Sequence, residues 1–185
     1  FFNICFLNLI AVIITLLNES SSIWKVLYYI PKILIEVYNK TLLEHLIHNC
    51  VLVGISDIVI VTGHNSSKID DYLSKKEFRV NIELIYNANW ELPNGVSVLE
   101  SKNSIPKEDD FMISMSDHYY KDDLLLKIKN SDLSKTIVNV GSDYKIDMIH
   151  DLDDGMKLQI DKESNLVDAM SKDLMKYNAI DCGLF

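Results

Sequence analysis

The feature that most restricts the fold of this sequence is an unbroken apolar run, DIVIVT, at residues 57–62. A strand with one face in water alternates apolar and polar residues, whereas this run has four consecutive apolar residues at 58–61 and is rich in β-branched side chains. Such a strand must be covered on both faces, as happens in a parallel sheet with helices on either side. The run therefore predicts an α/β fold.

Helical and extended patterns alternate along the rest of the chain. Apolar residues recur at helical spacing over 42–53, and Gly54 supplies a helix stop. Extended segments are predicted at 11–14, 33–37, 80–86, 110–115 and 136–140, helices at 66–73 (capped by Ser66 or Ser67), 96–102 and 121–129, and a hairpin at 157–160 and 166–170. The alternation predicts a three-layer α/β/α domain with a mostly parallel, Rossmann-like sheet. Ligands of such sheets bind at the carboxyl ends of the strands, here after Ile14, Val61 and Met115.

Composition limits the partners. The 185 residues suit a single domain, residues 1–185, and 18 basic against 27 acidic residues give a net charge of −9. No basic run is interleaved with aromatic residues, so a nucleic-acid partner is not expected. An acidic protein that binds phosphates needs local lysines, backbone N–H groups or a divalent cation, which favours bound Mg²⁺. The three cysteines share no ligand spacing, which is typical of a reducing, cytoplasmic compartment.

The beginning of the chain allows two interpretations. Residues 1–17 are apolar apart from Asn3, Asn8 and Thr15, which approaches the length that spans a bilayer. No basic cluster sets an orientation and no small-residue site marks a signal peptide. We favour a buried strand at 11–14 preceded by an apolar extension, residues 1–10, over a membrane anchor.

Several motifs in order resemble the nucleotidyltransferase family, whose members make NDP-sugars and CDP-alcohols. The matching stretches are PKILIEV at 31–37, KTLLEH at 40–45, GISDIVIVTG at 54–63, NGVS at 94–97, MSDH at 115–118, Lys172, and YNAIDCGLF at 177–185. The resemblance spans about residues 11–185 and implies the nucleotide-diphospho-sugar transferase fold, without the last part of the family's domain. The Asp-His pair and the final motif are most similar to inositol-1-phosphate cytidylyltransferases.

The resemblance implies a set of site residues. Asp117 would hold Mg²⁺ against a triphosphate at a strand end, and Lys32 would balance the phosphate charge from the other side. The residues expected to bind the nucleotide are Thr62, Gly63, Asn94, Gly95 and Ser97, and those expected to bind the acceptor are Lys172 and Asp181. The dipeptide Asn94-Gly95 would equally make an ordinary turn.

The sequence departs from the family in the turn after the first strand. Residues 15–25 lack the two glycines and the arginine whose backbone and charge cradle the triphosphate. A catalytically impaired nucleotide-binding module, an altered amino-terminal sequence and an unusual working loop are all compatible with this. The expected reaction transfers CMP from CTP, or another NMP from its NTP, to inositol 1-phosphate. Sugar 1-phosphates and phosphocholine are alternative acceptors, and fusion to a CDP-alcohol phosphotransferase is possible.

Overall fold

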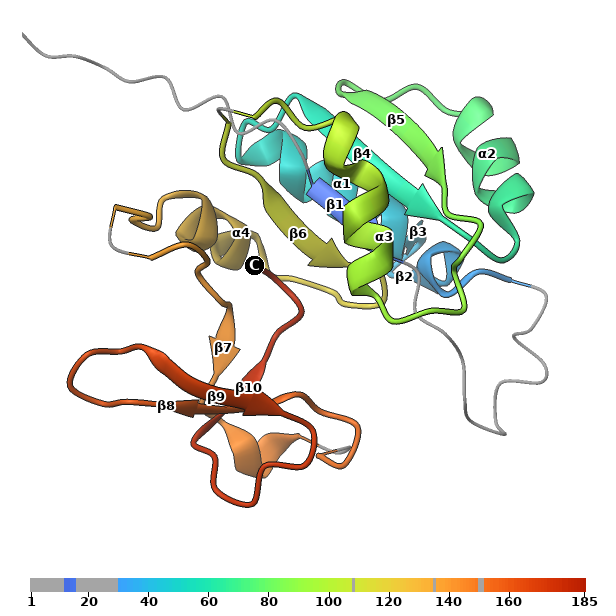
Figure 1. Ribbon diagram of the computed structural model, residues 1–185. Coiled ribbons are helices and arrows are strands. Elements are labelled where there is room, and N and C mark those ends of the chain that lie inside the picture. The colour runs from blue at the N-terminus through green and yellow to red at the C-terminus, as the bar shows by residue number, and fades with distance from the viewer. Residues whose placement is uncertain (1–11, 16–29, 108, 135, 150–151) are drawn as a thin grey trace, which may run out of the picture. The chain divides into compact units, whose positions relative to one another are not determined.

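The computed structural model of the protein describes residues 12–15, 30–107, 109–134, 136–149 and 152–185. The chain forms two compact units, Phe1–Asn130 (unit 1) and Ser131–Phe185 (unit 2), which are described separately (Figure 1). The expected turn at residues 15–25 and the apolar extension at residues 1–10 fall almost wholly outside the described residues. The single-domain organisation stays a prediction.

Unit 1 contains a four-stranded parallel sheet in the order β5-β4-β1-β6. Its elements are β1 (Val12–Thr15), the 3-10 helix η3 (Lys32–Leu34), β2 (Glu36–Val37), β3 (Lys40–Thr41), α1 (Leu42–Leu52), β4 (Asp57–Thr62), α2 (Ser66–Ser74), β5 (Asn81–Tyr86), α3 (Gly95–Glu100), η4 (Ser101–Asn103), β6 (Met112–Met115) and α4 (Asp122–Lys129). The strand order reverses between β1 and β6, because β1 pairs with β4 on one side and with β6 on the other. The carboxyl ends of these strands therefore form the edge at which ligands bind in doubly wound folds.

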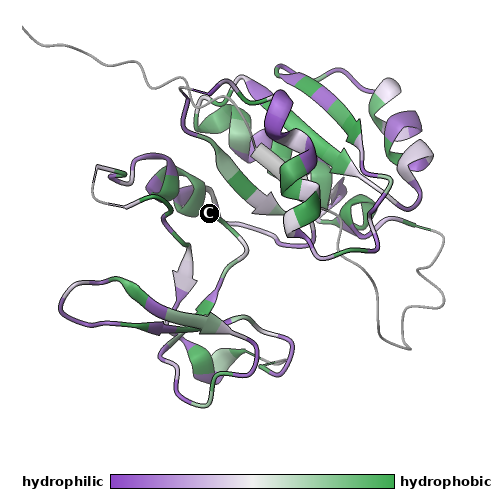
Figure 2. Ribbon diagram, in the orientation of Figure 1, coloured by the Kyte–Doolittle hydropathy of each residue, from purple (hydrophilic) through white to green (hydrophobic). Residues whose placement is uncertain are grey.

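Helices cover both faces of this sheet, which confirms the three-layer α/β prediction (Figure 1). Val59 and Val61 of β4 pack with Val98 of α3 on one face. Ile58 and Ile60 alternate with them along β4, so they point to the opposite face, where α1 lies, and are at most 1% exposed. In Figure 2, the middle of β4 is green while the outer helix α2 is mostly purple and white. The buried run at 57–62 thus forms the expected strand.

Helix α1 is capped at both ends. It begins with a capping box, in which the Thr41 hydroxyl accepts from the Glu44 N–H and the Glu44 carboxylate accepts from the Thr41 N–H. Its C-cap, Val53, is followed by Gly54, whose φ of +77° suits glycine; the Gly54 N–H donates to the Val51 carbonyl and the Ile55 N–H donates to the Cys50 carbonyl. These are the hydrogen bonds of a Schellman motif, so the predicted glycine stop is confirmed.

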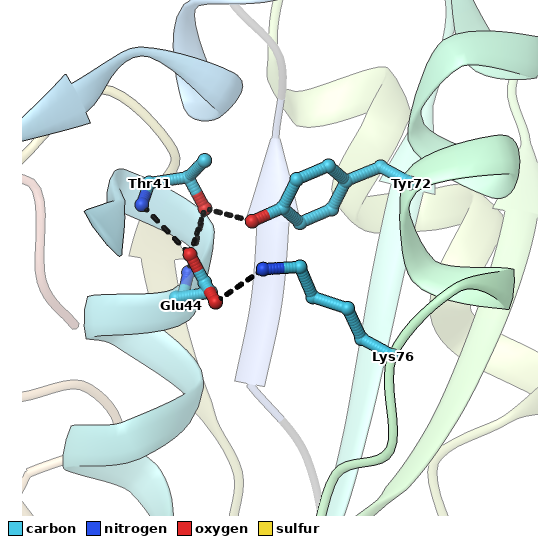
Figure 3. A network of polar contacts seen from close by, with 4 residues as sticks. All are labelled: Thr41, Glu44, Tyr72 and Lys76. Carbon is cyan, nitrogen blue, oxygen red and sulfur yellow. Dashed lines mark hydrogen bonds and ion pairs between the residues drawn. The ribbon is translucent and has the colours of Figure 1, made fainter. Parts of the chain in front are cut away.

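Glu44 also joins α1 to the far end of α2 (Figure 3). Its carboxylate pairs with Lys76 at 2.6 Å, and Tyr72 of α2 hydrogen-bonds the Thr41 hydroxyl at 3.1 Å. Partial burial opposes ionisation of Glu44, but the hydrogen bonds from Lys76 and Thr41 outweigh it and lower its pKa from 4.5 to about 2. One carboxylate therefore serves a helix cap and an interhelical ion pair together.

Two local predictions for unit 1 need correction. Residues 33–37 were expected to be extended throughout, but η3 occupies the first part and only Glu36–Val37 pairs as a strand. The strand belongs to a hairpin with β3, and its two-residue turn has positive φ at Tyr38 and Asn39, the geometry that two-residue hairpins favour. Helix α2 is not capped by a serine, because its N-cap is Asn65, in a left-handed conformation with no side-chain cap hydrogen bond.

Unit 2 is an antiparallel sheet of short strands in the order β7-β10-β8-β9. Its strands are β7 (Ser142–Asp143), β8 (Lys157–Ile160), β9 (Val167–Ser171) and β10 (Ala179–Asp181), with the 3-10 helix η5 (Ile146–Met148) after β7. Leu158, Ile160 and Ala179 form its core. The Asn178 amide extends the pairing, because its Oδ1 accepts from the Ile160 N–H at 2.8 Å and its Nδ2 donates to the Ile160 carbonyl at 2.7 Å.

The β8–β9 hairpin of unit 2 confirms a prediction, whereas the strand predicted at 136–140 does not form. The chain there is irregular, with Ile137 97% and Val138 57% exposed, and pairing starts only at β7. The apolar pattern at 136–140 was therefore a wrong guide to strand position. Among the described residues, no helix combines the length and apolarity that crossing a bilayer requires.

The Glu44 network predicts a pH-dependent stability term. Because the pKa of Glu44 is lowered in the folded chain, its stabilisation is complete above the usual value of 4.5 and is lost as the pH falls towards about 2. Glu44→Gln keeps the capping box but removes the ion pair, and we expect it to lower the free energy of unfolding by about 1 kcal/mol at pH 7. In urea unfolding, the difference from the parent should shrink between pH 5 and pH 3.

Asp71→Asn is the matched control. It removes an exposed ion pair with Lys75 within α2, so its cost should stay within about 0.5 kcal/mol. Equal stability profiles for Asp71→Asn and Glu44→Gln across this pH range would show that Glu44 plays no special part.

Candidate functional site

Asp117 lies two residues beyond the end of β6, at the edge where the strand order reverses. The strand positions it because Met112 and Ser114 are buried and fix the direction in which the chain leaves the sheet. Its side chain is 22% exposed, and its Oδ1 lies 2.9 Å from Nδ1 of His118. The carboxylate is thus held in place while part of it stays accessible.

The surroundings of Asp117 favour its charged form. Burial raises the pKa of this carboxyl, but the hydrogen bond and charge of His118 and the charge of Lys32 outweigh burial, so the pKa lies below its usual 3.8. Asp117 is therefore ionised at neutral pH. A charged, partly accessible oxygen ligand at a strand end suits a hard cation such as Mg²⁺.

Lys32 lies close enough to Asp117 for its charge to act on that carboxylate. It opens the 3-10 helix η3, which Pro31 begins through a hydrogen bond from the Leu34 N–H to the Pro31 carbonyl. Ile33, the next residue, is fully buried and anchors this turn in unit 1, so the half-buried Lys32 is held by its neighbours. The two residues predicted to be catalytic thus both lie in unit 1, and the charge of one lowers the pKa of the other, although their positions in the sequence lie far apart.

Thr62 and Gly63 sit at the carboxyl end of β4, and both are buried. The Thr62 hydroxyl donates to the Ile85 carbonyl at 3.2 Å, which ties β4 to its neighbour β5. A Cβ added at Gly63 would lie 2.3 Å from Cβ of Trp90, and the Trp90 ring also packs against His64 at 5.2 Å. Their visible contacts are structural, and their roles towards a nucleotide stay predictions.

Asn94, Gly95 and Ser97 form the start of helix α3. Asn94 is the N-cap without a side-chain cap hydrogen bond, and Gly95 faces open space. Ser97 is buried, and its hydroxyl accepts from Nδ2 of Asn87 at 3.0 Å. Asn87 follows β5 directly and is 1% exposed, so it holds the start of α3 against the sheet edge. This supporting contact between Asn87 and Ser97 was not predicted from the sequence, although the position of Asn87 directly after a strand was a usable signal.

Lys172 and Asp181 both lie in unit 2. The Lys172 ammonium pairs with Asp154 at 2.5 Å on the surface, and one oxygen of Asp181 accepts from the Gly183 N–H at 2.7 Å. Gly183 has a φ of +67°, so the turn after β10 depends on glycine. Their proposed role with an acceptor stays a prediction.

The loop after Asp117 contains ordered contacts that were not predicted from the sequence. His118 stacks on Tyr120 with ring centroids 6.0 Å apart, and Tyr120 is 5% exposed. The buried Ser114 hydroxyl donates to the Tyr120 hydroxyl at 3.3 Å. The apolar pattern of the sequence does not indicate that Tyr120 is buried. Its burial depends on its contact with Ser114 of β6, which the fold brings together with it.

The described residues contain no group of three or more His, Cys, Asp or Glu side chains arranged to enclose a metal. Mg²⁺ does not need such a cage, since it is commonly bound by one or two carboxylates, with water and substrate phosphates filling its octahedron. The single ionised carboxylate of Asp117 fits an ion that arrives with a triphosphate.

The parallel sheet, its reversal point and the helices on both of its faces define an α/β protein of the doubly wound class. The family model for nucleotidyl transferases matches residues 21–147, which is more than half of the chain. The chain therefore belongs to the nucleotidyl transferase family.

Solved structures share the fold at low sequence identity. The inositol-1-phosphate CTP transferase from T. maritima is 19% identical, with a TM-score of 0.78 over 96% of this chain and 69% of that one. UDP-glucose pyrophosphorylase from Acinetobacter baumanii is 16% identical, with a TM-score of 0.75 over 94% and 72%. HddC from Yersinia pseudotuberculosis is 18% identical, with a TM-score of 0.69 over 95% and 74%. No curated protein matches the sequence.

The two glycines of the site allow a paired stability test. Gly63→Ala places a methyl group against Trp90 next to the main chain, where neither side can yield easily, and we expect it to cost about 1–3 kcal/mol. Gly95→Ala meets nothing within 4 Å and should leave stability unchanged or raise it by up to about 1 kcal/mol. Urea unfolding followed by circular dichroism measures both. Equal costs would rule out close packing as the reason for glycine at 63.

Proposed function

We propose that this protein transfers a nucleotidyl group from an NTP to the phosphate of a small phosphorylated alcohol, with CTP and inositol 1-phosphate as the first pair to test. The observation that carries the proposal is the partly accessible carboxylate of Asp117 just beyond β6, whose pKa is lowered by His118 and by the charge of Lys32. Family membership and the fold shared with nucleotide-handling enzymes support it. The solved complex of HddC with GMP-PN supports a nucleotide as the ligand.

In the proposed reaction, an oxygen of the acceptor phosphate attacks the α-phosphorus of the NTP. A new O–P bond forms and the bond to the β-phosphate oxygen breaks, so pyrophosphate leaves with the bonding electrons. Mg²⁺ bound at Asp117 would neutralise phosphate charge. Lys32 would place a second positive charge on the phosphates, and the loop after β6 would hold the Asp117 carboxylate at a fixed angle.

The direct test measures pyrophosphate release by the full chain with CTP, inositol 1-phosphate and Mg²⁺. We expect release that depends on all three components. Parallel assays with the other NTPs, with sugar 1-phosphates and with phosphocholine identify the preferred pair. CTP binding by calorimetry with no release under any combination would instead support the non-catalytic nucleotide-binding module to which the departures at residues 15–25 point.

Substitution of Asp117 and of Lys32 separates their roles. Asp117→Asn removes the ionised metal ligand, so Mg²⁺-dependent release should fall about a hundredfold or more. Lys32→Met removes one charge on the phosphates and should cost about tenfold to a hundredfold. Steady-state kinetics at saturating Mg²⁺ measures both losses.

The matched controls are Asp123→Asn on α4 and Lys102→Met on η4, each an exposed residue that is not among the proposed site residues. Both should keep the parent rate within about twofold. Parent-like rates for Asp117→Asn and Lys32→Met would exclude this site as the reaction centre.

A further inference from the structure

Two polar residues of α1 reach the loop that follows Asp117. The His45 ring meets the Tyr119 ring edge-on, with centroids 5.0 Å apart and an interplanar angle of 87°. Asn49 donates from Nδ2 to the Tyr120 carbonyl at 3.1 Å. Residues four apart lie on one face of a helix. His45 and Asn49 therefore contact two successive loop residues, Tyr119 and Tyr120, from adjacent turns of α1.

The same helix also holds the segment that follows Lys32. Nε2 of His45 lies 2.7 Å from the Val37 carbonyl, and the Leu42 N–H donates to the Ile35 carbonyl at 3.0 Å. Val37 and Ile35 come directly after η3, which carries Lys32. His45 therefore contacts both the segment that follows Lys32 and the loop that follows Asp117.

The polar character of Asn49 needs an explanation beyond packing. Asn49 is 5% exposed and lies on the buried side of α1 with Leu46, Ile47 and Cys50. Burying an amide costs free energy unless it is hydrogen-bonded, whereas leucine would fill the same space without that cost. A buried hydrogen bond of this kind favours one arrangement of its two partners. Here it fixes the position of the Tyr120 carbonyl, three residues after Asp117.

We propose that His45 and Asn49 are positioning residues that make α1 the spacer between the Lys32 ammonium and the Asp117 carboxylate. The inference rests on the proposed function, since it assigns these two groups to the substrate phosphates. Asn49 fixes the loop after Asp117, and His45 fixes both that loop and the segment after Lys32. The two substitutions therefore have different expected effects.

The first measurement is hydrogen exchange, followed by mass spectrometry of the full chain under native conditions. Asn49→Leu should speed exchange of residues 117–120 about tenfold or more and leave residues 33–38 unchanged, because a buried carbonyl loses its partner. His45→Leu should speed exchange in both segments. His48→Leu, an exposed position on the same helix, is the matched control and should change neither.

The second measurement is steady-state pyrophosphate release per folded molecule. Asn49→Leu and His45→Leu should lower kcat about tenfold with little change in KM for CTP. Misplaced charges reduce the stabilisation of the transition state more than they reduce the binding of CTP. His45→Gln keeps an N–H donor for the Val37 carbonyl and should recover at least half of the lost kcat. A merely structural role would leave kcat per folded molecule at the parent value.

Failure of the inference differs from failure of the proposed function. Parent-like exchange at 117–120 in both leucine variants overturns the spacer role, whatever the activity. Faster exchange with unchanged kcat also overturns it. In a parent chain that releases no pyrophosphate, the proposed function fails and the exchange pattern alone decides. In that case, the spacer role of α1 is supported by faster exchange in both segments of His45→Leu and in residues 117–120 alone of Asn49→Leu. Any other exchange pattern rejects it.

Discussion

The structure of unit 1 depends on one requirement, that a parallel strand with two apolar faces be covered on both. Strand β4 sets this requirement, because its side chains alternate between the face under α3 and the face under α1 and are buried on both. With helices on both faces, the polar ends of the strands remain at one open edge. The reversal of strand order between β1 and β6 then makes this edge the place where charged groups can gather.

The charges proposed to act at this edge include a positive one, although the chain as a whole is negative. The protein carries a net charge of −9, so anionic phosphates are repelled at long range. Lys32 offers a local positive charge, and Asp117 offers an ionised ligand for a cation that would itself bring positive charge. For the function proposed above, this local arrangement would matter more than net charge.

Much of the fold could be predicted from the residues, because burial on two faces and helical spacing leave clear patterns. The run at 57–62 and the glycine after α1 are examples. The predicted strand at 136–140 failed because apolar residues such as Ile137 can lie exposed, and a pattern records composition but not burial. The β2–β3 turn was missed because Tyr38 seldom adopts positive φ, so its residue type gave no turn signal.

The candidate site could be predicted in part for a related reason. Asp117 stood out because it directly follows a strand, and the structure places it at the expected edge, whereas its role towards a metal stays a prediction. The contacts of His45 and Asn49 could not be found in the sequence. They depend on α1 packing beside the end of β6, and this neighbourhood follows from strand order, not from residue spacing.

The double use of Glu44 has a consequence for how unit 1 fluctuates. Because the same carboxylate completes the cap of α1 and holds Lys76 just beyond α2, fraying of α2 withdraws support from the first turn of α1. The two helix ends should therefore open as one cooperative foldon instead of independently. Motion that starts on the outer surface of the molecule would in this way reach the hairpin that follows Lys32.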